Sequence, residues 1–366
     1  TDGKNTSISG FDITTKKGLI ALFSNKVISA SPKTIEEYTV TITLVNHNFD
    51  QNNNTGKNLS GKLIIQKDEY KVSLADYVIS QYTGKQGENN IYYHDSNLEN
   101  GAGDNSYRYA GANPNNYVCF GSDEATCPHE NLYRIIGLID GKIKLISADV
   151  ATTDMLGTDG GYYNTTSGAG WNSSHYKESG DFTKIGLYKW NSTSTNTWST
   201  SLFNKINLNT NYLNNIGTTW SNLIEDTTWK VSGHTTDIVT PKAMFTAEIT
   251  NATKTYGSEN GTSKIGLMYV SDYGFAAAPS AWTTPFYKYN SSAIKSVNWM
   301  YMGLDEWTIT PNSLNSSSVF TFNSSGNLAY ASVGNGYVVR PVLYLKASIA
   351  YAGGSGTKDS PITLEV

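Results

Sequence analysis

The segment between residues 116 and 147 constrains the fold more than any other part of the sequence. It contains three β-rich runs, at residues 117–120, 132–139 and 142–146. An aspartate-glycine dipeptide joins the last two runs, and it favours a tight hairpin because both turn positions adopt positive φ. Residues 142–146 also alternate between polar and apolar side chains, as a half-buried strand does. The sequence therefore predicts a meander of three consecutive antiparallel strands.

The two cysteines of the chain, Cys119 and Cys127, flank the loop between the first two of these strands. A bridge there would remove about 2–3 kcal/mol of unfolded-state entropy, because it closes a short loop. Two cysteines this close in a chain of 366 residues are typical of one structural disulfide formed in an oxidising compartment. The alternative is a pair of reduced, buried thiols. We expect the disulfide, and with it an extracellular location at the cell surface.

The charge composition disfavours two classes of partner. Charged residues make up only 16% of the chain and the net charge is −4, whereas about a quarter of a typical soluble protein is charged. No basic field is present to hold nucleic acid or an anionic lipid surface. No apolar run approaches the roughly 18 residues of a membrane-spanning helix. The chain starts as an exported, mature product would, so we expect that any export signal before Thr1 has been removed or omitted.

Residues 1–72 are predicted to form a small β-sandwich, of the immunoglobulin-like or jelly-roll kind. Residues 38–46 alternate strictly, residues 61–67 alternate again, and a polar loop separates the two runs. A domain this small with an open sheet edge could accept a strand from another copy of the chain. Self-association through residues 1–72 is therefore the expected assembly contact.

The remaining chain is predicted to be a larger α+β domain, so the fold class is α+β, mainly β. Residues 73–87 have the pattern of a short helix and linker, with Ser73 as the N-cap. Residues 88–366 combine many short strands with long loops and few helices. The helices are expected at residues 199–215, where apolar side chains recur every three or four positions, and at residues 279–289, with a further turn near 220–226.

Several long motifs in residues 88–366 resemble a poorly characterised family of exported surface proteins from uncultured Firmicutes and Mollicutes-like gut bacteria. The motifs stand at residues 104–122, 127–128, 131–137, 265–277, 306–309 and 340–345. The resemblance implies an exported surface protein and little about its biochemistry. More faintly, residues 46–66 resemble β-rich domains of Gram-positive surface fibres, in which an N-terminal segment completes the sheet of the next subunit.

The order of elements in residues 88–366 also resembles a C-type-lectin-like fold of the bacterial kind. Strands, a helix, tryptophan-rich loops, a Glu306-Trp307 strand and a closing strand at residues 340–345 match that order. The chain lacks the Glu-Pro-Asn and Gln-Pro-Asp tripeptides that carry calcium-dependent sugar binding in such proteins. The resemblance thus implies the fold without calcium-dependent lectin activity.

Aromatic side chains in polar loops are the strongest sequence signal for a binding surface. Tyrosine and tryptophan give a large contact area at low rotamer cost, and they pack on sugar faces and protein patches. The alternative is that they form the core of the long loops themselves. The best candidates for a binding rim are Trp282, Trp299, Asp305, Glu306 and Trp307.

No catalytic motif or cofactor motif is present, and we expect a protein that is not an enzyme. The five histidines stand singly, and neither a zinc motif nor a nucleophile elbow nor a phosphate loop occurs. Asp305 and Glu306 would point to opposite faces of a strand, so they cannot act together as acid and base unless a bulge intervenes, and Asp272 is a possible partner for either one. Glycoside hydrolysis remains the less favoured alternative.

Calcium is the one cation that the acidic loops would suit, although no motif supports it. Oxygen ligands on glycine-rich loops occur in two sets without EF-hand spacing. Solvated loop acids are the competing interpretation for both sets, so no cofactor is predicted. The sets are Asp149, Asp154 and Asp159, and Asp95, Glu99 and Asp104.

Three functions follow from these patterns, in order of preference. The first is an exported bacterial cell-surface structural or adhesive protein, a pilus-like filament subunit joined through residues 1–72 and displaying a lectin-like domain. The second is a monomeric surface module that binds a host carbohydrate or protein. The third is a glycoside hydrolase.

Overall fold

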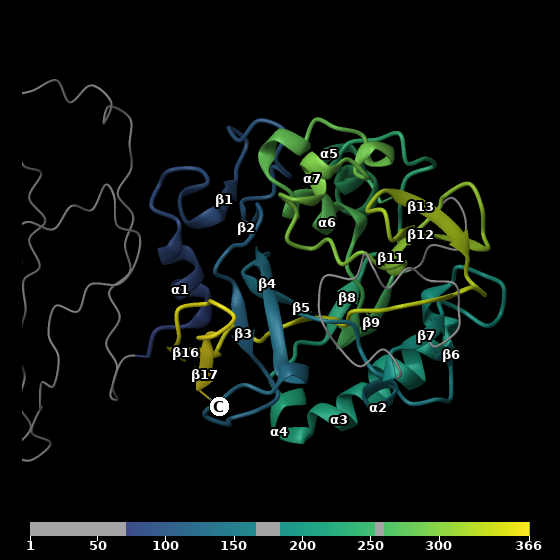
Figure 1. Ribbon diagram of the computed structural model, residues 1–366, viewed down its shortest axis with the longest axis horizontal. Helices are drawn as coiled ribbons and strands as arrows, with labels where there is room; N and C mark the ends of the chain where they lie inside the picture. The colour runs from purple at the N-terminus through teal and green to yellow at the C-terminus, as the bar shows by residue number, and fades with distance from the viewer. Residues whose placement is uncertain (1–70, 166–183, 253–259, 366) are drawn as a thin grey trace, which may run out of the picture. The chain divides into compact units, whose positions relative to one another are not determined.

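The computed structural model describes residues 71–165, 184–252 and 260–365 (Figure 1). They form an α+β fold that is mainly β, with antiparallel sheets joined by long loops. The β-sandwich predicted for residues 1–72 lies outside the described residues, apart from Lys71 and Val72. Within the described ranges, no helix is both long and apolar enough to cross a membrane.

The largest sheet has seven strands and holds the predicted meander. Its strands run in the order β1-β2-β4-β5-β15-β10, and β3 pairs with β4. Every pairing in this sheet is antiparallel. The strands are β1 (Ile91–His94), β2 (Ser106–Tyr109), β3 (Tyr117–Cys119), β4 (Leu132–Ile139), β5 (Lys142–Ser147), β10 (Ile265–Gly266) and β15 (Val342–Tyr344).

The structure confirms the three-stranded meander. Strands β3, β4 and β5 are consecutive and antiparallel. Asp140 and Gly141 have φ values of 51° and 71°, as the predicted hairpin turn requires. The β4–β5 register shifts between Ile135 and Gly137. At Gly137 an added Cβ would meet the Tyr107 carbonyl oxygen of β2 at 2.2 Å, so this close approach of two strands requires glycine.

Four smaller sheets surround the large one. Two have three strands, in the orders β11-β12-β13 and β14-β7-β6, and two have two strands, β16-β17 and β8-β9. Their strands are β6 (Tyr162–Thr165), β7 (Gly186–Lys189), β8 (Thr227–Trp229), β9 (Gly261–Ser263), β11 (Glu306–Pro311), β12 (Ser318–Phe322), β13 (Leu328–Ser332), β14 (Gly336–Tyr337), β16 (Ala350–Gly353) and β17 (Thr363–Glu365).

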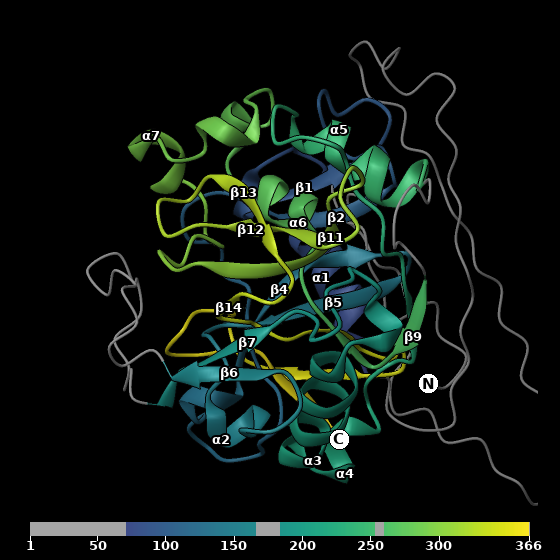
Figure 2. The same cartoon turned by 90° about the vertical axis from the view of Figure 1, so that its right-hand side faces the viewer.

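Apart from α1, which lies near β4 and β5, the α-helices lie in two groups on opposite sides of the β4–β5 hairpin, with α5, α6 and α7 in one group and α2, α3 and α4 in the other (Figure 2). The α-helices are α1 (Leu74–Gln81), α2 (Thr153–Leu156), α3 (Leu213–Ile216), α4 (Thr218–Ser221), α5 (Pro241–Phe245), α6 (Val270–Ala276) and α7 (Ser292–Lys295). Tighter or wider helical turns are η2 (Glu88–Asn90), η3 (His129–Asn131), η6 (Trp198–Thr200), η7 (Phe203–Tyr212), η8 (Thr246–Thr250), η9 (Pro279–Ala281) and η10 (Phe286–Lys288).

Two of the predicted helices are found and one is not. Helix α1 begins as expected, because the Ser73 hydroxyl accepts a hydrogen bond from the Asp76 amide at 3.0 Å. The helix expected at 199–215 is present as the π-helical segment η7 followed by α3. The prediction of a helix at residues 279–289 is wrong. The chain there makes only two separate turns, and Pro285, which has no N–H to donate, precedes the second.

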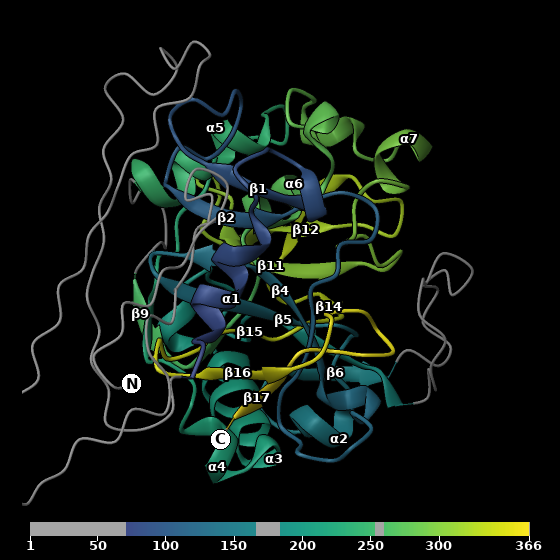
Figure 3. The ribbon, with the colours of Figure 1, turned by 90° about the vertical axis from the view of Figure 1, so that its left-hand side faces the viewer.

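The segment that leads into α1 meets β16 at a seam. The Leu74 amide donates to the Ile349 carbonyl and the Tyr351 amide donates to the Val72 carbonyl, both at 2.8 Å. The Tyr77 and Tyr351 rings stack with centroids 4.1 Å apart. Figure 3 shows α1 beside β16 at this seam, which ties the start of the unit to its end.

Candidate functional site

The three tryptophans of the predicted binding rim lie in the core. Trp282, Trp299 and Trp307 are at most 3% exposed. Each indole N–H donates to a backbone carbonyl, of Ala277, Tyr109 and Tyr188 respectively. The prediction that these rings are exposed is wrong, because in a fold with long loops they supply the buried packing of the loops.

The two carboxylates of the predicted rim are also engaged inside the fold. Glu306 is buried and forms a two-pronged ion pair with Arg340, with N–O distances of 2.7 and 2.9 Å. Burial raises the pKa of Glu306, and the Arg340 guanidinium opposes that shift. Asp305 accepts a hydrogen bond from the Ser324 amide at 2.6 Å. The Glu306–Arg340 pair therefore ties β11 to the segment before β15.

The largest group of charges in the described interior is an ion cluster of Asp104, Arg108, Lys144 and Asp272. Arg108 contacts Asp104 at 2.8 Å and Asp272 at 3.3 Å, and Lys144 contacts Asp272 at 2.5 Å. Two cations face two anions, so the cluster is neutral as a whole. It joins β2, β5 and the first turn of α6. The predicted Asp272 is paired with Arg108 and Lys144, whereas Glu306 is paired with Arg340.

Aromatic rings enclose the two cations of the ion cluster. The Arg108 guanidinium lies 5.5 Å from the Phe245 ring centroid and 5.4 Å from that of Phe275. The Lys144 ammonium lies 4.5, 5.4 and 5.9 Å from the rings of Tyr269, Tyr344 and Trp229 respectively. These faces stabilise the cations where water is excluded.

Another buried carboxyl, that of Glu248 on η8, faces the start of α6. It accepts hydrogen bonds from the Val270 amide at 2.9 Å, the Ser271 amide at 3.2 Å and the Thr310 hydroxyl. Burial raises the pKa of Glu248 to about 7, and the negative charge of Asp272 adds to the shift while the hydrogen bonds oppose it. The side chain therefore changes its charge near neutral pH.

His94 lies next to the ion cluster as a neutral ring. Its Nδ1 accepts a hydrogen bond from the Ala102 amide at 3.0 Å, so the proton is assigned to Nε2. Within the described residues that Nε2 has no hydrogen-bond partner. Burial, and then the Arg108 charge, hold the pKa of His94 well below its usual range. Its ring contacts Phe275 and Trp282 instead.

Sequence reasoning did not identify the roles of Arg108, Lys144, Glu248 or His94. Lys144 occupies a polar position in the alternating strand β5, which predicts a side chain in solvent. The two cations of the ion cluster lie more than 100 positions from Asp272, Arg108 by 164 and Lys144 by 128. No local pattern in the sequence could have indicated such contacts.

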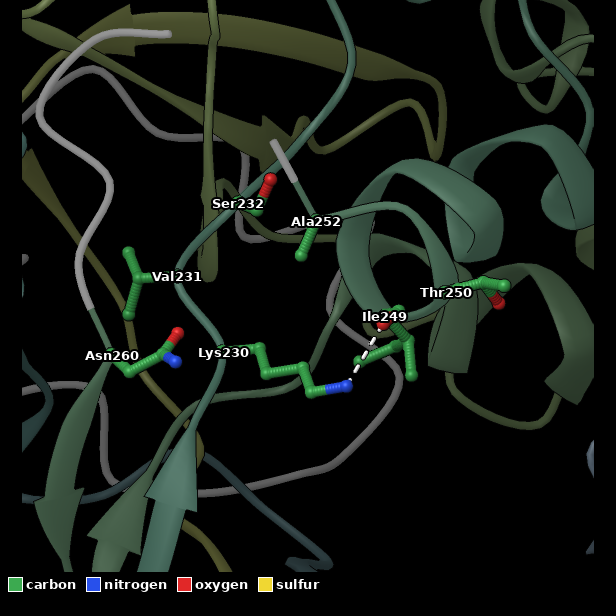
Figure 4. A pocket seen from close by; sticks show the side chains of 7 residues that line it. All are labelled: Lys230, Val231, Ser232, Ile249, Thr250, Ala252 and Asn260. Carbon is green, nitrogen blue, oxygen red and sulfur yellow. Dashed lines mark hydrogen bonds between the residues drawn. The ribbon is translucent and has the colours of Figure 1, made fainter. Parts of the chain in front are cut away.

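A pocket of about 280 Å³ is lined by residues outside the ion cluster (Figure 4). The Lys230 side chain lines the pocket, and its ammonium group donates to the Ile249 carbonyl at 2.9 Å. Lys230 is the one titratable side chain among the described lining residues, so they supply no acid–base pair. The lining consists of Lys230, Val231, Ser232, Ile249, Thr250, Ala252 and Asn260.

The two sets of acids considered for calcium do not come together. Asp154 pairs with Lys184 at 3.0 Å, and Asp159 accepts from the Asn211 amide group. Asp104 belongs to the ion cluster, whereas Asp95 caps the turn that follows it. In the described part of the chain, no three His, Cys, Asp or Glu side chains are grouped to hold a metal ion.

The structure confirms the predicted disulfide between Cys119 and Cys127, which links the end of β3 to the loop before β4. Comparison with known proteins gives no relative: no family model, no curated protein and no solved structure matches the chain. The surface-protein family and the lectin-like resemblance therefore stay predictions.

Proposed function

We propose that the protein is an exported bacterial cell-surface protein with a structural role, a filament subunit that joins copies of itself through residues 1–72 and displays the described α+β unit. The observation that carries the proposal is the Cys119–Cys127 disulfide, since such bonds form and persist in oxidising, extracellular compartments. The low charged fraction of the chain agrees with that location.

The interior of the described unit supports a structural role. The ions of the Glu306–Arg340 pair and of the ion cluster are paired with one another. Five tryptophans are buried with their N–H groups bonded to backbone carbonyls: Trp190, Trp229, Trp282, Trp299 and Trp307. These contacts make a firmly packed body suited to display.

Electron microscopy of the protein as shed from its source cells tests the filament role. We expect regular filaments from the full chain. A chain lacking residues 1–20 should yield isolated particles whose α+β unit has unchanged circular dichroism. Isolated particles of the full chain would contradict the filament role, and filaments of the truncated chain would contradict a joint within those residues.

A monomeric binding module is the second candidate, and one surface observation favours it. Ile238 and Leu314 are 66% and 65% exposed. Their loops lie together, because the Ser313 amide donates to the His234 carbonyl at 3.2 Å. Exposed apolar side chains on adjacent loops are suited to packing against a sugar face or a protein patch.

Binding to a glycan array and to host surface proteins tests this second candidate. We expect Ile238→Ser with Leu314→Ser to abolish any binding seen with the native chain. Tyr330→Ser is the matched control, because Tyr330 is also exposed but lies on β13. Equal binding by the double variant and the native chain would exclude this loop pair.

A further inference from the structure

The Lys144–Asp272 contact differs from the exposed lysine–carboxylate pairs of the described chain. Its N–O distance is 2.5 Å, and the two side chains are 1% and 2% exposed. Lys142, two residues away on the same strand, pairs with Glu225 at 2.8 Å, but those side chains are 38% and 30% exposed. Only the first pair is thus held in contact with water excluded.

The pair is enclosed by aromatic side chains. Tyr269, Tyr344 and Trp229 face the lysine nitrogen. The Lys144 ammonium and the Asp272 carboxylate are in direct contact, so transfer of one proton between them gives a neutral amine beside a neutral acid. A neutral amine is a nucleophile. Lys144 Nζ contacts Asp272 Oδ2, and that oxygen is bonded directly to the carboxyl carbon, Cγ.

The Asp272 carboxyl is oriented by two donors. Arg108 Nη1 donates to Oδ1 at 3.3 Å, and the Tyr269 amide donates to Oδ2 at 2.9 Å. A guanidinium at Oδ1 stabilises the negative charge that develops on that oxygen when a nucleophile adds to Cγ. Oδ2 remains the oxygen that can leave.

We propose that Lys144 and Asp272 form an intramolecular isopeptide bond. The amine Nζ adds to Cγ, a carbon–nitrogen bond forms, and the bond from Cγ to Oδ2 breaks. Oδ2 leaves as water, with one proton from the acid and one from the amine. The product is a neutral amide whose carbonyl oxygen still faces Arg108, and the reaction needs no oxidant, metal or second substrate.

Intact-mass spectrometry of the purified full chain, with its disulfide reduced, tests this proposal. We expect the mass to fall short of the sequence mass by one water molecule. Proteolysis should then release one branched peptide that carries Lys144 and Asp272. A chain with the full sequence mass overturns the proposal directly, without the need for any variant.

Two variants and one competing site complete the test. Lys144→Arg keeps a cation but not the amine nucleophile, so its mass should equal the sequence mass. Lys142→Arg, the matched control on the same strand, should keep the missing water and the branched peptide. The dipeptide Asp140-Gly141 can also lose water, through a cyclic imide. A water loss mapped there, with Lys144 and Asp272 on separate peptides, overturns the proposal.

Discussion

Several buried side chains carry a charge that a buried partner of opposite charge compensates. Two cases are Glu306 with Arg340 and Asp272 with its two cations. Removal of one partner leaves the charge of the other buried and uncompensated. An uncompensated buried charge costs far more than a surface ion pair contributes. Stability at this scale therefore depends on which member of a pair is changed.

Glu306→Gln should lower the free energy of unfolding by about 3–5 kcal/mol, because Arg340 loses its anion while it stays buried. Urea unfolding followed by tryptophan fluorescence measures the change. Asp154→Asn is the control, since the Asp154–Lys184 pair is exposed and should contribute about 0–1 kcal/mol. Equal effects of the two substitutions would show that the buried pair contributes no more than the surface pair.

Glu248 should make stability depend on pH. Its pKa is about 7 in the folded chain and near the ordinary 4.5 when unfolded. Between these values the folded state binds the proton that the unfolded state has released, so the contribution is full below about pH 4.5 and falls as pH rises to about 7. The total loss is up to about 3 kcal/mol.

Unfolding free energies at several pH values test this sign. Glu248→Gln should flatten the decline between pH 4.5 and 7. Glu225→Gln should leave the decline unchanged, because a hydrogen bond from Lys142 and its charge lower the pKa of Glu225 and move its titration below that window. A decline that survives in Glu248→Gln would assign the effect to another group.

At the scale of elements, local signals could be read from the sequence and long-range ones could not. The Asp140-Gly141 turn predicts the β4–β5 hairpin because the dipeptide itself favours the required backbone. Residues 279–289, which contain Trp282 and Phe286, were expected to be helical, but Pro285 has no N–H to donate and the chain there makes two separate turns. Spacing reports which face is apolar and not whether the backbone can continue.

Gly137→Ala should destabilise the meander by about 1–3 kcal/mol, because its Cβ would overlap the Tyr107 carbonyl on β2. Thermal unfolding measures this effect. Gly334→Ala is the control, since its Cβ would meet nothing nearer than the Ser332 hydroxyl at 3.9 Å. If both variants unfold like the native chain, β2 and β4 can separate at no cost.

Replacing Cys119 and Cys127 by serine together should lower the free energy of unfolding by about 2–3 kcal/mol, as expected for a bridge between residues eight positions apart. The reduced native chain is the matched control and should lose a similar amount. Unchanged unfolding of both would place the disulfide outside the cooperative unit.

At the scale of the molecule, the candidate site could not be predicted, because its members meet only after folding. The sequence shows that tryptophans are frequent in the loops, but it does not show whether they are exposed at a binding rim or buried in the core. The packing of the long loops buries them. Lys144 and Asp272 are 128 positions apart. A covalent bond between them would close a loop whose unfolded-state entropy is worth about 5 kcal/mol, more than the disulfide.

The seam between the start and the end of the unit determines how it responds to tension. The Val72 carbonyl accepts from the Tyr351 amide, and the Leu74 amide donates to the Ile349 carbonyl. A force that pulls Val72 and Glu365 apart therefore loads the Val72–Tyr351 hydrogen bond first and the Leu74–Ile349 hydrogen bond after it. The β16–β17 pair is loaded in the same way, since Ala350 lies opposite Glu365. Both should peel apart one hydrogen bond at a time at low force, and lengthen the chain while the seven-stranded sheet still holds.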